Sequence, residues 1–256
     1  MGHARLVLAA SLALCIGGVA HAACDTGLAE RMNEKLHPQR ALDHERAVCE
    51  PWRGFPGRYV VVLPLPRPGS EGGSTRFDLD VLVVQQADNG NTEHARVASR
   101  LYEENALAED DALRIAEIRL DMARYTLAPE VHAFGLRILR QESSIEKAYS
   151  DESLSLYAPQ GARLVKLLDR LQTTRERGQP DGNCAGEFEA LRGSVSVARV
   201  SSNGLAELLL RQSRSESRSA QQGEECVMQE SPTTYSTRLL RYDGKEYRKA
   251  KGAAPD

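Results

Sequence analysis

Apolar and polar positions along much of the chain alternate with a period of two, the pattern of a β-strand with one buried face. Clear examples are 131–139 (VHAFGLRIL) and 153–157 (SLSLY). Two other runs, 58–65 (RYVVVLPL) and 76–84 (RFDLDVLVV), are apolar over most of their length. Short apolar runs rich in β-branched residues also favour strands. The pattern therefore predicts a β protein from residue 58 onward.

The last third of the chain contains the strongest turn signal. Asn203-Gly204 separates the runs 194–200 and 205–213, and Asn-Gly favours the type I′ turn of a two-residue hairpin. Such a turn fixes the register of the strands that it joins. The predicted pairs are Val197–Leu210 and Arg199–Leu208. Further strands of the same meander are expected at Cys226–Glu230, Thr233–Tyr242 and Lys245–Lys249.

A second two-residue turn is expected at Asp243-Gly244, within LLRYDGKEYR (239–248). The predicted pairs are Tyr242–Lys245, Arg241–Glu246 and Leu240–Tyr247. This register puts Leu240, Tyr242 and Tyr247 on one buried face and makes an ion pair of Arg241 and Glu246. Asp243, Gly244 and Lys245 are therefore interpreted as the tip of a hairpin and not as a reactive or ion-binding loop.

Two segments have an ambiguous pattern. The segment 164–171 (LVKLLDRL) spaces its leucines like an amphipathic helix, and 112–125 (ALRIAEIRLDMARY) is rich in helix-forming residues. Short turn-bounded elements surround both, which favours strands, although a helix stays open for each. A strand at 112–125 would need a β-bulge near Glu117, because the alternation changes phase there.

The chain is expected to divide into three parts. Residues 1–22 have the layout of a signal peptide: Arg5, an apolar run too short to span a bilayer, and an Ala20-His21-Ala22 cleavage site. Residues 23–57 form an N-terminal segment stapled by a disulfide, with a short helix between Thr26 and His37. Residues 58–256 form an antiparallel β domain. The predicted fold class is mainly β, a meander of about ten to twelve short strands in a sandwich or propeller-like domain, with a short N-terminal helical lobe.

Four cysteines follow the signal peptide, an even number that is typical of exported, disulfide-bonded chains. They are Cys24, Cys49, Cys184 and Cys226. Three connectivities are open, and proximity along the chain favours Cys24–Cys49 and Cys184–Cys226. Lipoprotein anchoring through Cys24 is disfavoured, because His21 stands where a lipoprotein signal has Leu. No Cys-x-x-Cys pair is present, so we expect these cysteines to bind no metal.

Composition excludes several kinds of partner. The chain has 33 Lys and Arg against 36 Asp and Glu, a net charge of −3. Its basic residues are scattered among acids, which disfavours nucleic acid and a polybasic membrane contact. No segment after the signal peptide is a transmembrane candidate. The expected location is the periplasm, and the sequence leaves the oligomeric state open.

Few residues suggest chemistry. Ser144 and Lys147 match the Ser-x-x-Lys motif of penicillin-recognising enzymes, but the accompanying motifs are missing and the segment is interpreted as a polar loop. Asp78 and Asp80 share a strand face and could do acid–base work or bind calcium, and we interpret them as a solvated strand end. His37 and His44 are expected to be solvated.

Three further features are interpreted as structural. The acidic loop at 88–93 lacks the spacing of a calcium-binding EF-hand. His94 and His132 are expected on strand surfaces, and Trp52 is expected to pack on the N-terminal disulfide. We therefore expect no catalytic residue, metal ligand or cofactor-binding residue in this chain.

Several segments resemble uncharacterised exported β-rich proteins of Gram-negative bacteria. The segments are CEPWRGFPG (49–57), VVVLPLP (60–66), RFDLDVLVV (76–84), LDMARYTLAPEVHAFGLRI (120–138), NCAGEFE (183–189) and RLLRYDGKEY (238–247). This resemblance implies a periplasmic β-rich protein and brings no catalytic residues. The terminal RYDGKEY also resembles hairpins that close some periplasmic lysozyme-inhibitor and toxin-immunity proteins, although the acidic calcium loops of some of those proteins are missing here.

Three functions follow as hypotheses. The first is a non-enzymatic periplasmic module that binds another periplasmic or envelope protein, for example as an inhibitor or immunity protein for a cell-wall hydrolase. Its contact surfaces would be the loops at 66–74 and 143–152. The second is a periplasmic hydrolase, with converging polar groups in a deep pocket. The third is a structural or maturation factor of the envelope that has no discrete site.

Overall fold

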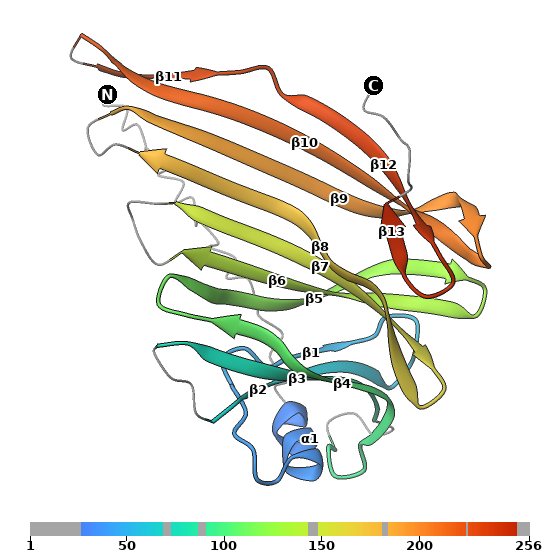
Figure 1. The fold of residues 1–256 in the computed structure, drawn as a ribbon. Coiled ribbons are helices and arrows are strands. Elements are labelled where there is room, and N and C mark those ends of the chain that lie inside the picture. The colour runs from blue at the N-terminus through green and yellow to red at the C-terminus, as the bar shows by residue number, and fades with distance from the viewer. Residues whose placement is uncertain are drawn as a thin grey trace, which may run out of the picture.

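The computed structural model describes residues 27–68, 73–86, 91–142, 148–180, 184–223 and 225–249. The signal peptide, Cys24, Ser144 and Lys147 lie outside these residues. The described residues form one helix and thirteen strands (Figure 1). The elements are α1 (Leu28–Leu36), β1 (Val48–Pro51), β2 (Arg58–Pro66), β3 (Thr75–Gln85), β4 (Arg96–Glu109), β5 (Leu113–Ala128), β6 (Val131–Glu142), β7 (Tyr149–Gln160), β8 (Arg163–Pro180), β9 (Gly186–Ser202), β10 (Leu205–Gln222), β11 (Glu225–Glu230), β12 (Thr234–Tyr242) and β13 (Tyr247–Lys249). The predicted mainly-β fold with a short N-terminal helix is confirmed.

The strands follow one another through antiparallel hairpins. β1 to β4 pair in sequence, and so do β5 to β10. The two series meet where β4 and β8 pair in parallel at Arg100 and Arg163, so the strands make one mixed sheet that does not close on itself. In Figure 1, β1–β4 lie below β5–β8 and α1 lies beneath them. Several strands are long, and β8 and β10 have 18 residues each.

β11 and β12 depart from the expected meander. Both strands pair with β10, where Ser217–Gln222 faces β11 and Leu208–Arg214 faces β12. They are thus two parts of one edge strand, which is interrupted at residues 231–233. Pro232 lies in this interruption and, because it has no amide proton, it cannot donate to the ladder.

Three apolar clusters hold the lower part of the fold together. The first lies between β1–β4 and β5–β7, which gives this part the layers of a sandwich. The second joins β7–β10 and β12–β13 to the far end of the β5–β6 hairpin. The third packs α1 against the other face of β2 and β3. Trp52 contacts Phe134 in the first cluster, whereas Cys49 belongs to the third, so the expected packing of Trp52 on the disulfide is wrong.

Both ambiguous segments are strands. Residues 164–171 lie in β8 and residues 113–125 in β5. The register of β5 shifts between Ile115 and Glu117, where the change of phase predicted a bulge. Helix propensity is overridden here, because the alternating face reaches the first apolar cluster.

The hairpin at Asn203-Gly204 turns as predicted, but its register slips. Both residues have positive φ, 48° and 86°, as a type I′ turn requires. The first pairs, Leu205–Ser202 and Ala206–Ser201, keep the predicted register. A bulge between Ala206 and Leu208 then moves the ladder, and Leu208 faces Val197 and Leu210 faces Val195. The predicted pairs Val197–Leu210 and Arg199–Leu208 are therefore wrong.

The closing hairpin has a longer turn than predicted. Tyr242 pairs with Tyr247, Arg241 with Arg248 and Leu240 with Lys249, so the predicted pairs are wrong by two residues. The Asp243 carboxylate accepts the amides of Lys245 and Glu246 at 2.9 and 2.8 Å, and this side-chain turn replaces the two-residue turn. Leu240 and Tyr247 are buried as expected, whereas Arg241 pairs with Glu207 and Glu246 pairs with Arg248.

The disulfide Cys184–Cys226 is present, as predicted. It joins the start of β9 to β11 across 42 residues of chain. Cys49 is also disulfide-bonded, but Cys24 lies outside the described residues, so the pairing of these two cysteines stays a prediction.

Replacing Cys184 and Cys226 by Ser should loosen β11 selectively. β11 pairs only with β10 among the described strands and buries no apolar side chain, so its order depends on the disulfide. Amide exchange at β11 should rise by about tenfold or more, a local loss of about 1.4 kcal/mol, while exchange at β2 and β3 stays unchanged. Hydrogen exchange read by mass spectrometry tests this, and equal protection of β11 in both proteins would contradict it.

Candidate functional site: a buried carboxylate pair and an open sheet

Asp78 and Asp80 are not at a solvated strand end, as the sequence suggested. Their exposed fractions are 1% and 0%, and both point from β3 toward the N-terminal segment. Phe77, Leu79 and Val81 occupy the opposite face of β3, inside the first apolar cluster. A buried carboxylate needs compensating partners, and these come from distant parts of the sequence.

Asp78 is held by four different groups. Arg40 donates to it from both terminal nitrogens, at 3.1 and 3.0 Å, and the Tyr102 hydroxyl donates at 2.7 Å. The amide of Asn105 donates at 2.8 Å, and Arg67 forms an ion pair at 3.4 Å. Burial alone would raise the pKa of Asp78, but these donors and charges hold it below its ordinary value.

Asp80 has two basic partners. His37 and Asp80 lie 2.7 Å apart between ring nitrogen Nε2 and carboxylate oxygen, and Arg100 pairs with the same carboxylate at 2.7 Å. The expected solvation of His37 is therefore wrong, because the third apolar cluster brings the end of α1 onto β3. His44 is exposed, as expected, and contacts Glu30. The two histidines do not share a site.

Arg40 and His37 belong to the N-terminal segment, so the two carboxylates fasten that segment to the sheet. Arg40 also donates to the backbone carbonyls of Leu65 and Pro66 at 3.2 and 3.3 Å, which strengthens the same attachment. The donors around Asp78 hold its pKa below the ordinary value, so this carboxylate is kept ionised. The geometry therefore supports a structural role for Asp78 and Asp80.

Asp78→Asn should lower the free energy of unfolding by about 3 kcal/mol or more, because removing one partner of a buried ion pair leaves Arg40 uncompensated. Urea unfolding followed by the fluorescence of Trp52, the single tryptophan, measures the change. The matched control is Glu30→Gln, which removes an exposed carboxylate paired with exposed His44 and should cost about 0.5 kcal/mol or less. Equal effects of the two substitutions would contradict the attachment.

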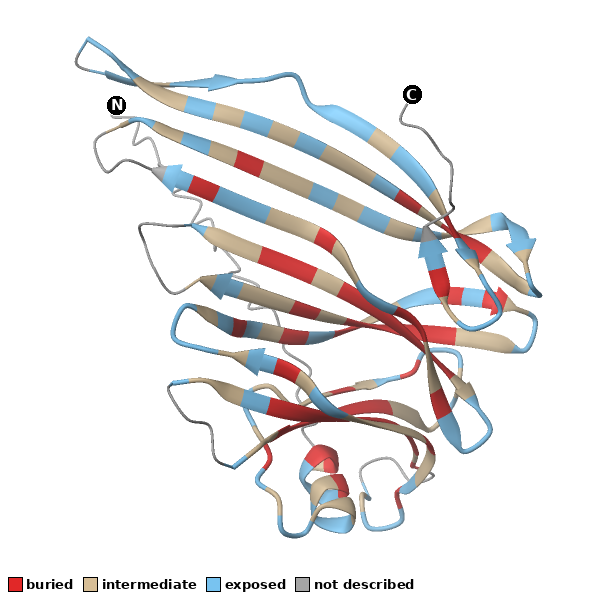
Figure 2. Cartoon of the chain, in the orientation of Figure 1, coloured by how far each residue is buried: buried red, intermediate tan, exposed pale blue. Residues whose placement is uncertain are grey.

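The upper part of the β-sheet has no core on either face. We call it the open sheet and define it as residues 174–179 of β8, 186–196 of β9, 211–222 of β10, 225–230 of β11 and 234–239 of β12. No apolar side chain in these described segments is buried. Figure 2 shows the contrast between the buried residues lower in the fold and the mostly exposed or half-buried open sheet. Backbone pairing, disulfide Cys184–Cys226 and polar side chains must hold it.

A row of alternating charges, which we call the charge row, crosses the inner face of the sheet, the face on which β10 presents Leu208 and Leu210 lower down. It begins on β6 and β7, beside the open sheet, and continues onto β8, β9 and β10. In this order its residues are Arg140, Asp151, Arg175, Glu189 and Arg214. Arg140 pairs with Asp151 at 2.8 Å and Arg175 with Glu189 at 2.7 Å. Cross-strand pairs of opposite charge stabilise a sheet, so this charge row supplies some of the stability that a core supplies elsewhere.

Glu189 is the centre of the charge row. Its exposed fraction is 8%, and it pairs with Arg175, Arg177 and Arg214 at 2.7, 2.8 and 3.4 Å. Burial alone would raise the pKa of Glu189, but the hydrogen bond from Arg175 and the charges of the three arginines hold it below its ordinary value. Glu189 is therefore ionised at neutral pH and fixes three guanidinium groups.

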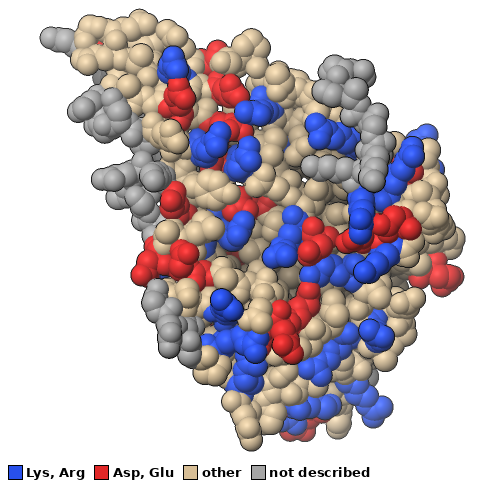
Figure 3. All heavy atoms as spheres, viewed as in Figure 1, with Lys and Arg blue, Asp and Glu red and all other residues tan. Residues whose placement is uncertain are grey.

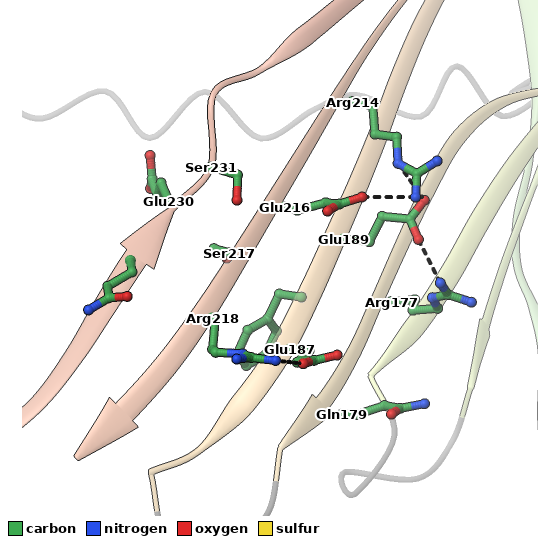
Figure 4. A pocket seen from close by; sticks show the side chains of 12 residues that line it. Arg177, Gln179, Glu187, Glu189, Arg214, Glu216, Ser217, Arg218, Glu230 and Ser231 are labelled. Atoms are coloured by element: carbon green, nitrogen blue, oxygen red, sulfur yellow. Dashed lines mark hydrogen bonds and ion pairs between the residues drawn. The ribbon is translucent and has the colours of Figure 1, made fainter.

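Arg177 and Arg214, together with Glu189, line an open hollow of about 630 Å³ on the inner face (Figure 4). Arg177 comes from β8, Glu187 and Glu189 from β9, and Arg214, Glu216 and Arg218 from β10. Arg218 pairs with Glu187, and Arg214 pairs with Glu216 at 2.9 Å. The charges along the hollow compensate one another, so it suits a polar partner and not a single strongly charged ion.

The outer face of the open sheet has a different character. β10 presents Ser213, Ser215, Ser217 and Ser219 there, and a second hollow of about 390 Å³ lies between β9, β10 and β12. Gly193, Arg211 and Tyr235 are among its lining residues. The exposed large apolar side chains among the described residues are Val200, Met228 and Tyr235. Met228 pairs with Ser219 and Tyr235 pairs with Ser213, which places these two on the outer face.

The open sheet is not among the features predicted above. Its signature in the sequence is 213–219 (SRSESRS), where serine alternates with charge, so that a strand has two polar faces. Figure 3 shows charges of both signs interspersed over the face in view. The expected contact loops at 66–74 and 143–152 lie partly outside the described residues, and 149–152 belongs to β7.

No family model, curated protein sequence or solved structure shows a significant match to this chain. Within the described residues, no group of three or more His, Cys, Asp or Glu side chains has the arrangement of a metal site. In the same part of the chain, no helix has the length and apolar character needed to cross a membrane. Function must therefore be inferred from the geometry of the open sheet.

Glu189→Gln should destabilise the protein at neutral pH by about 1–2 kcal/mol, because three arginines lose a shared carboxylate, discounted for their partial exposure. The pKa of Glu189 is lower in the folded state than the value of about 4.3 in the unfolded chain, so its contribution is present above that value and is lost as pH falls through the folded pKa. Thermal unfolding of wild type and variant should therefore differ at pH 7 and converge at strongly acidic pH.

The control for this comparison is Glu187→Gln, which removes an exposed carboxylate with one arginine partner. It should have little effect at either pH. If the difference in thermal stability between wild type and Glu189→Gln is as large at strongly acidic pH as at pH 7, the ionic origin of the stabilisation by Glu189 is contradicted.

Proposed function

We propose that this chain is an exported, non-enzymatic module that binds another protein of the cell envelope through its open sheet. The observation that carries the proposal is the ordered sheet without a core, whose side chains face solvent on both sides. The charge row centred on Glu189 helps to hold this sheet, but the side chains that are exposed on its two faces are free to serve recognition as well.

The surface chemistry of the open sheet suits a protein partner. Arginine and tyrosine are enriched at protein interfaces, and the open sheet presents Arg177, Arg218 and Tyr235 on exposed positions. The two hollows are wide and shallow, whereas small-molecule pockets are usually concave, mostly apolar and enclosing. The inner hollow is lined instead by charged side chains whose opposite charges compensate one another.

A hydrolase is supported less well by the residues that suggested it. Asp78 and Asp80 are buried under Arg40, Arg100 and His37, and a general acid or base must reach the proton that it transfers. Ser144 and Lys147 lie outside the described residues. A structural or maturation factor remains the second candidate, and the same binding experiment separates it from the first.

The proposed location is the periplasm. The disulfide Cys184–Cys226 is of the kind that persists in oxidising compartments. A cell-wall hydrolase is one possible partner, and in that case the module would act as an inhibitor or immunity protein. A captured hydrolase can be assayed directly for inhibition by the purified module.

Affinity capture from envelope extract, with quantitative mass spectrometry, tests the proposal. Two variants change the open sheet: Arg177→Glu/Arg218→Glu on the inner face and Arg192→Glu/Arg211→Glu on the outer face. We expect wild type to capture a reproducible partner, and at least one variant to lose it by about tenfold or more, since reversed charge at an interface costs over 1 kcal/mol.

The matched control is Arg31→Glu/Arg114→Glu, which reverses two exposed, ion-paired arginines outside the open sheet. It should capture the partner as wild type does. Absence of any reproducible partner would contradict the binding proposal, and so would a partner whose capture both open-sheet variants leave unchanged.

A further inference from the structure

The edge of β12 is open over residues 234–239 (TYSTRL). β12 pairs with β10 along one side over this stretch. On its other side β13 covers only Leu240–Tyr242, so among the described strands the backbone from Thr234 to Leu239 has no second neighbour. A free edge presents a row of amides and carbonyls that another strand can pair with.

Two hydrogen bonds show which residues of β12 face the open side. The amide of Tyr242 donates to the Ser202 hydroxyl at 3.0 Å, toward the β9–β10 turn. The amide of Asp243 donates to the Glu246 carbonyl at 3.0 Å, on the side of β13. Amide directions alternate along a strand, so the odd-numbered Tyr235, Thr237 and Leu239 present their amides and carbonyls to the open edge.

This stretch has little of the usual protection of edge strands. Natural edges are shielded by charged side chains, especially lysine, by proline, by bulges or by covering segments, and Arg238 is the one charged residue of this stretch. Residues 234–239 contain neither proline nor lysine, and their register with β10 has no bulge. Tyr235, with an exposed fraction of 80%, stands beside the outer hollow of about 390 Å³. The edge thus combines open backbone with an exposed aromatic side chain and a recess.

The edge is also electropositive. No acidic side chain lines the outer hollow, whereas Arg192 and Arg211 both do. Arg192 pairs with Glu176, but within the described part of the chain neither Arg211 nor Arg238 of β12 has an ion-pair partner. Complementary charge selects partners at interfaces, so the chemistry of this edge favours an acidic segment.

We propose that the partner of this protein adds an extended acidic segment to the β12 edge as a further strand. Backbone hydrogen bonds to Tyr235, Thr237 and Leu239 hold the segment, and the outer hollow takes one of its side chains. Arg211 lies opposite Thr237 on the outer face and Arg238 lies opposite Leu210 on the inner face, so each arginine selects acidic residues on its own face of the added strand. This is the β-addition mode of peptide recognition. The inference rests on the proposed function and names the chemistry of the partner.

A second copy of this chain fits the edge less well. Pairing two β12 edges would bring the Arg211 side chains of both copies onto the outer face of the junction and both Arg238 side chains onto its inner face. No acidic side chain lines the outer hollow to separate the outer pair. Like charges placed across a pair of strands destabilise it. An acidic segment of another protein meets the same edge without this repulsion.

Fluorescence anisotropy with a labelled ten-residue peptide of alternating Glu and Thr, whose Glu side chains all lie on one face of an extended strand, tests the proposal on the full mature protein. We expect a Kd in the range of about 10–100 µM. The same peptide with Lys in place of Glu should bind at least about tenfold more weakly. Arg211→Glu/Arg238→Glu reverses the charge on both faces of the edge, so it should weaken binding of the acidic peptide by a similar factor whichever face the Glu side chains occupy.

Thr237→Pro isolates the role of the backbone. It removes an amide that points to the open edge and not to β10, so the fold should persist, because proline is tolerated on the solvent side of edge strands. Thr237→Val keeps the amide and removes the hydroxyl. We expect the proline variant to lose the acidic peptide and the valine variant to bind it as wild type does. If the proline variant unfolds, binding of the acidic peptide to the Arg211→Glu/Arg238→Glu protein tests the proposal instead.

Equal binding of the acidic peptide to wild type and to folded Thr237→Pro would overturn the proposal, as would no binding to wild type at about 1 mM peptide. A concentration-dependent dimer that Thr237→Pro abolishes, seen by analytical ultracentrifugation, would assign the edge to a second copy instead. Capture of the envelope partner distinguishes failure of this inference from failure of the proposed function. If Thr237→Pro still captures the partner, strand addition at the β12 edge is refuted but protein binding is not. If wild type captures no partner, the proposed function is refuted.

Discussion

A sheet that is exposed on both faces cannot be held together by a hydrophobic core, and this constraint applies to the open sheet. Its strands are instead held by long antiparallel ladders, by the disulfide at Cys184–Cys226 and by the charge row centred on Glu189. Each ionic contact is worth little where it is exposed. A carboxylate shared by three guanidinium groups and shielded from water is worth more. The open sheet is therefore ordered by a few concentrated polar contacts.

The N-terminal segment uses the same principle in a buried setting. Its apolar residues pack on β2 and β3, but apolar packing has no directional preference and does not by itself fix how a short helix lies on a sheet. Asp78 and Asp80 supply that direction, because each accepts from basic residues whose positions are set by the segment's own fold. Ion pairs of this kind add specificity at some cost in desolvation. Here the desolvation cost arises at Asp78 and Asp80, where the N-terminal segment folds back across the sheet.

The sequence predicts local structure well where a pattern is decided by neighbouring residues. The bulge near Glu117 follows from the alternation alone, and the Asn203-Gly204 turn from its dipeptide. Register fails where two extra residues change it. Three residues of β9 lie opposite Glu207 alone, which moves the β9–β10 ladder by two positions, and Asp243 lengthens its turn by two residues when its carboxylate accepts two amides. The burial of Asp80 also escapes prediction, because Arg100 and His37 reach it from distant segments.

The free edge of the open sheet is formed by β11 and then by β12, and it is not uniform along its length. Pro232 stands in the interruption between the two strands, and proline discourages strand addition. From Thr234 to Leu239, β12 has no proline, no lysine and no bulge, and it carries an exposed tyrosine. Open edges of this kind promote aggregation, and natural proteins usually shield them. Recognition of another strand therefore explains this open stretch better than simple tolerance of it.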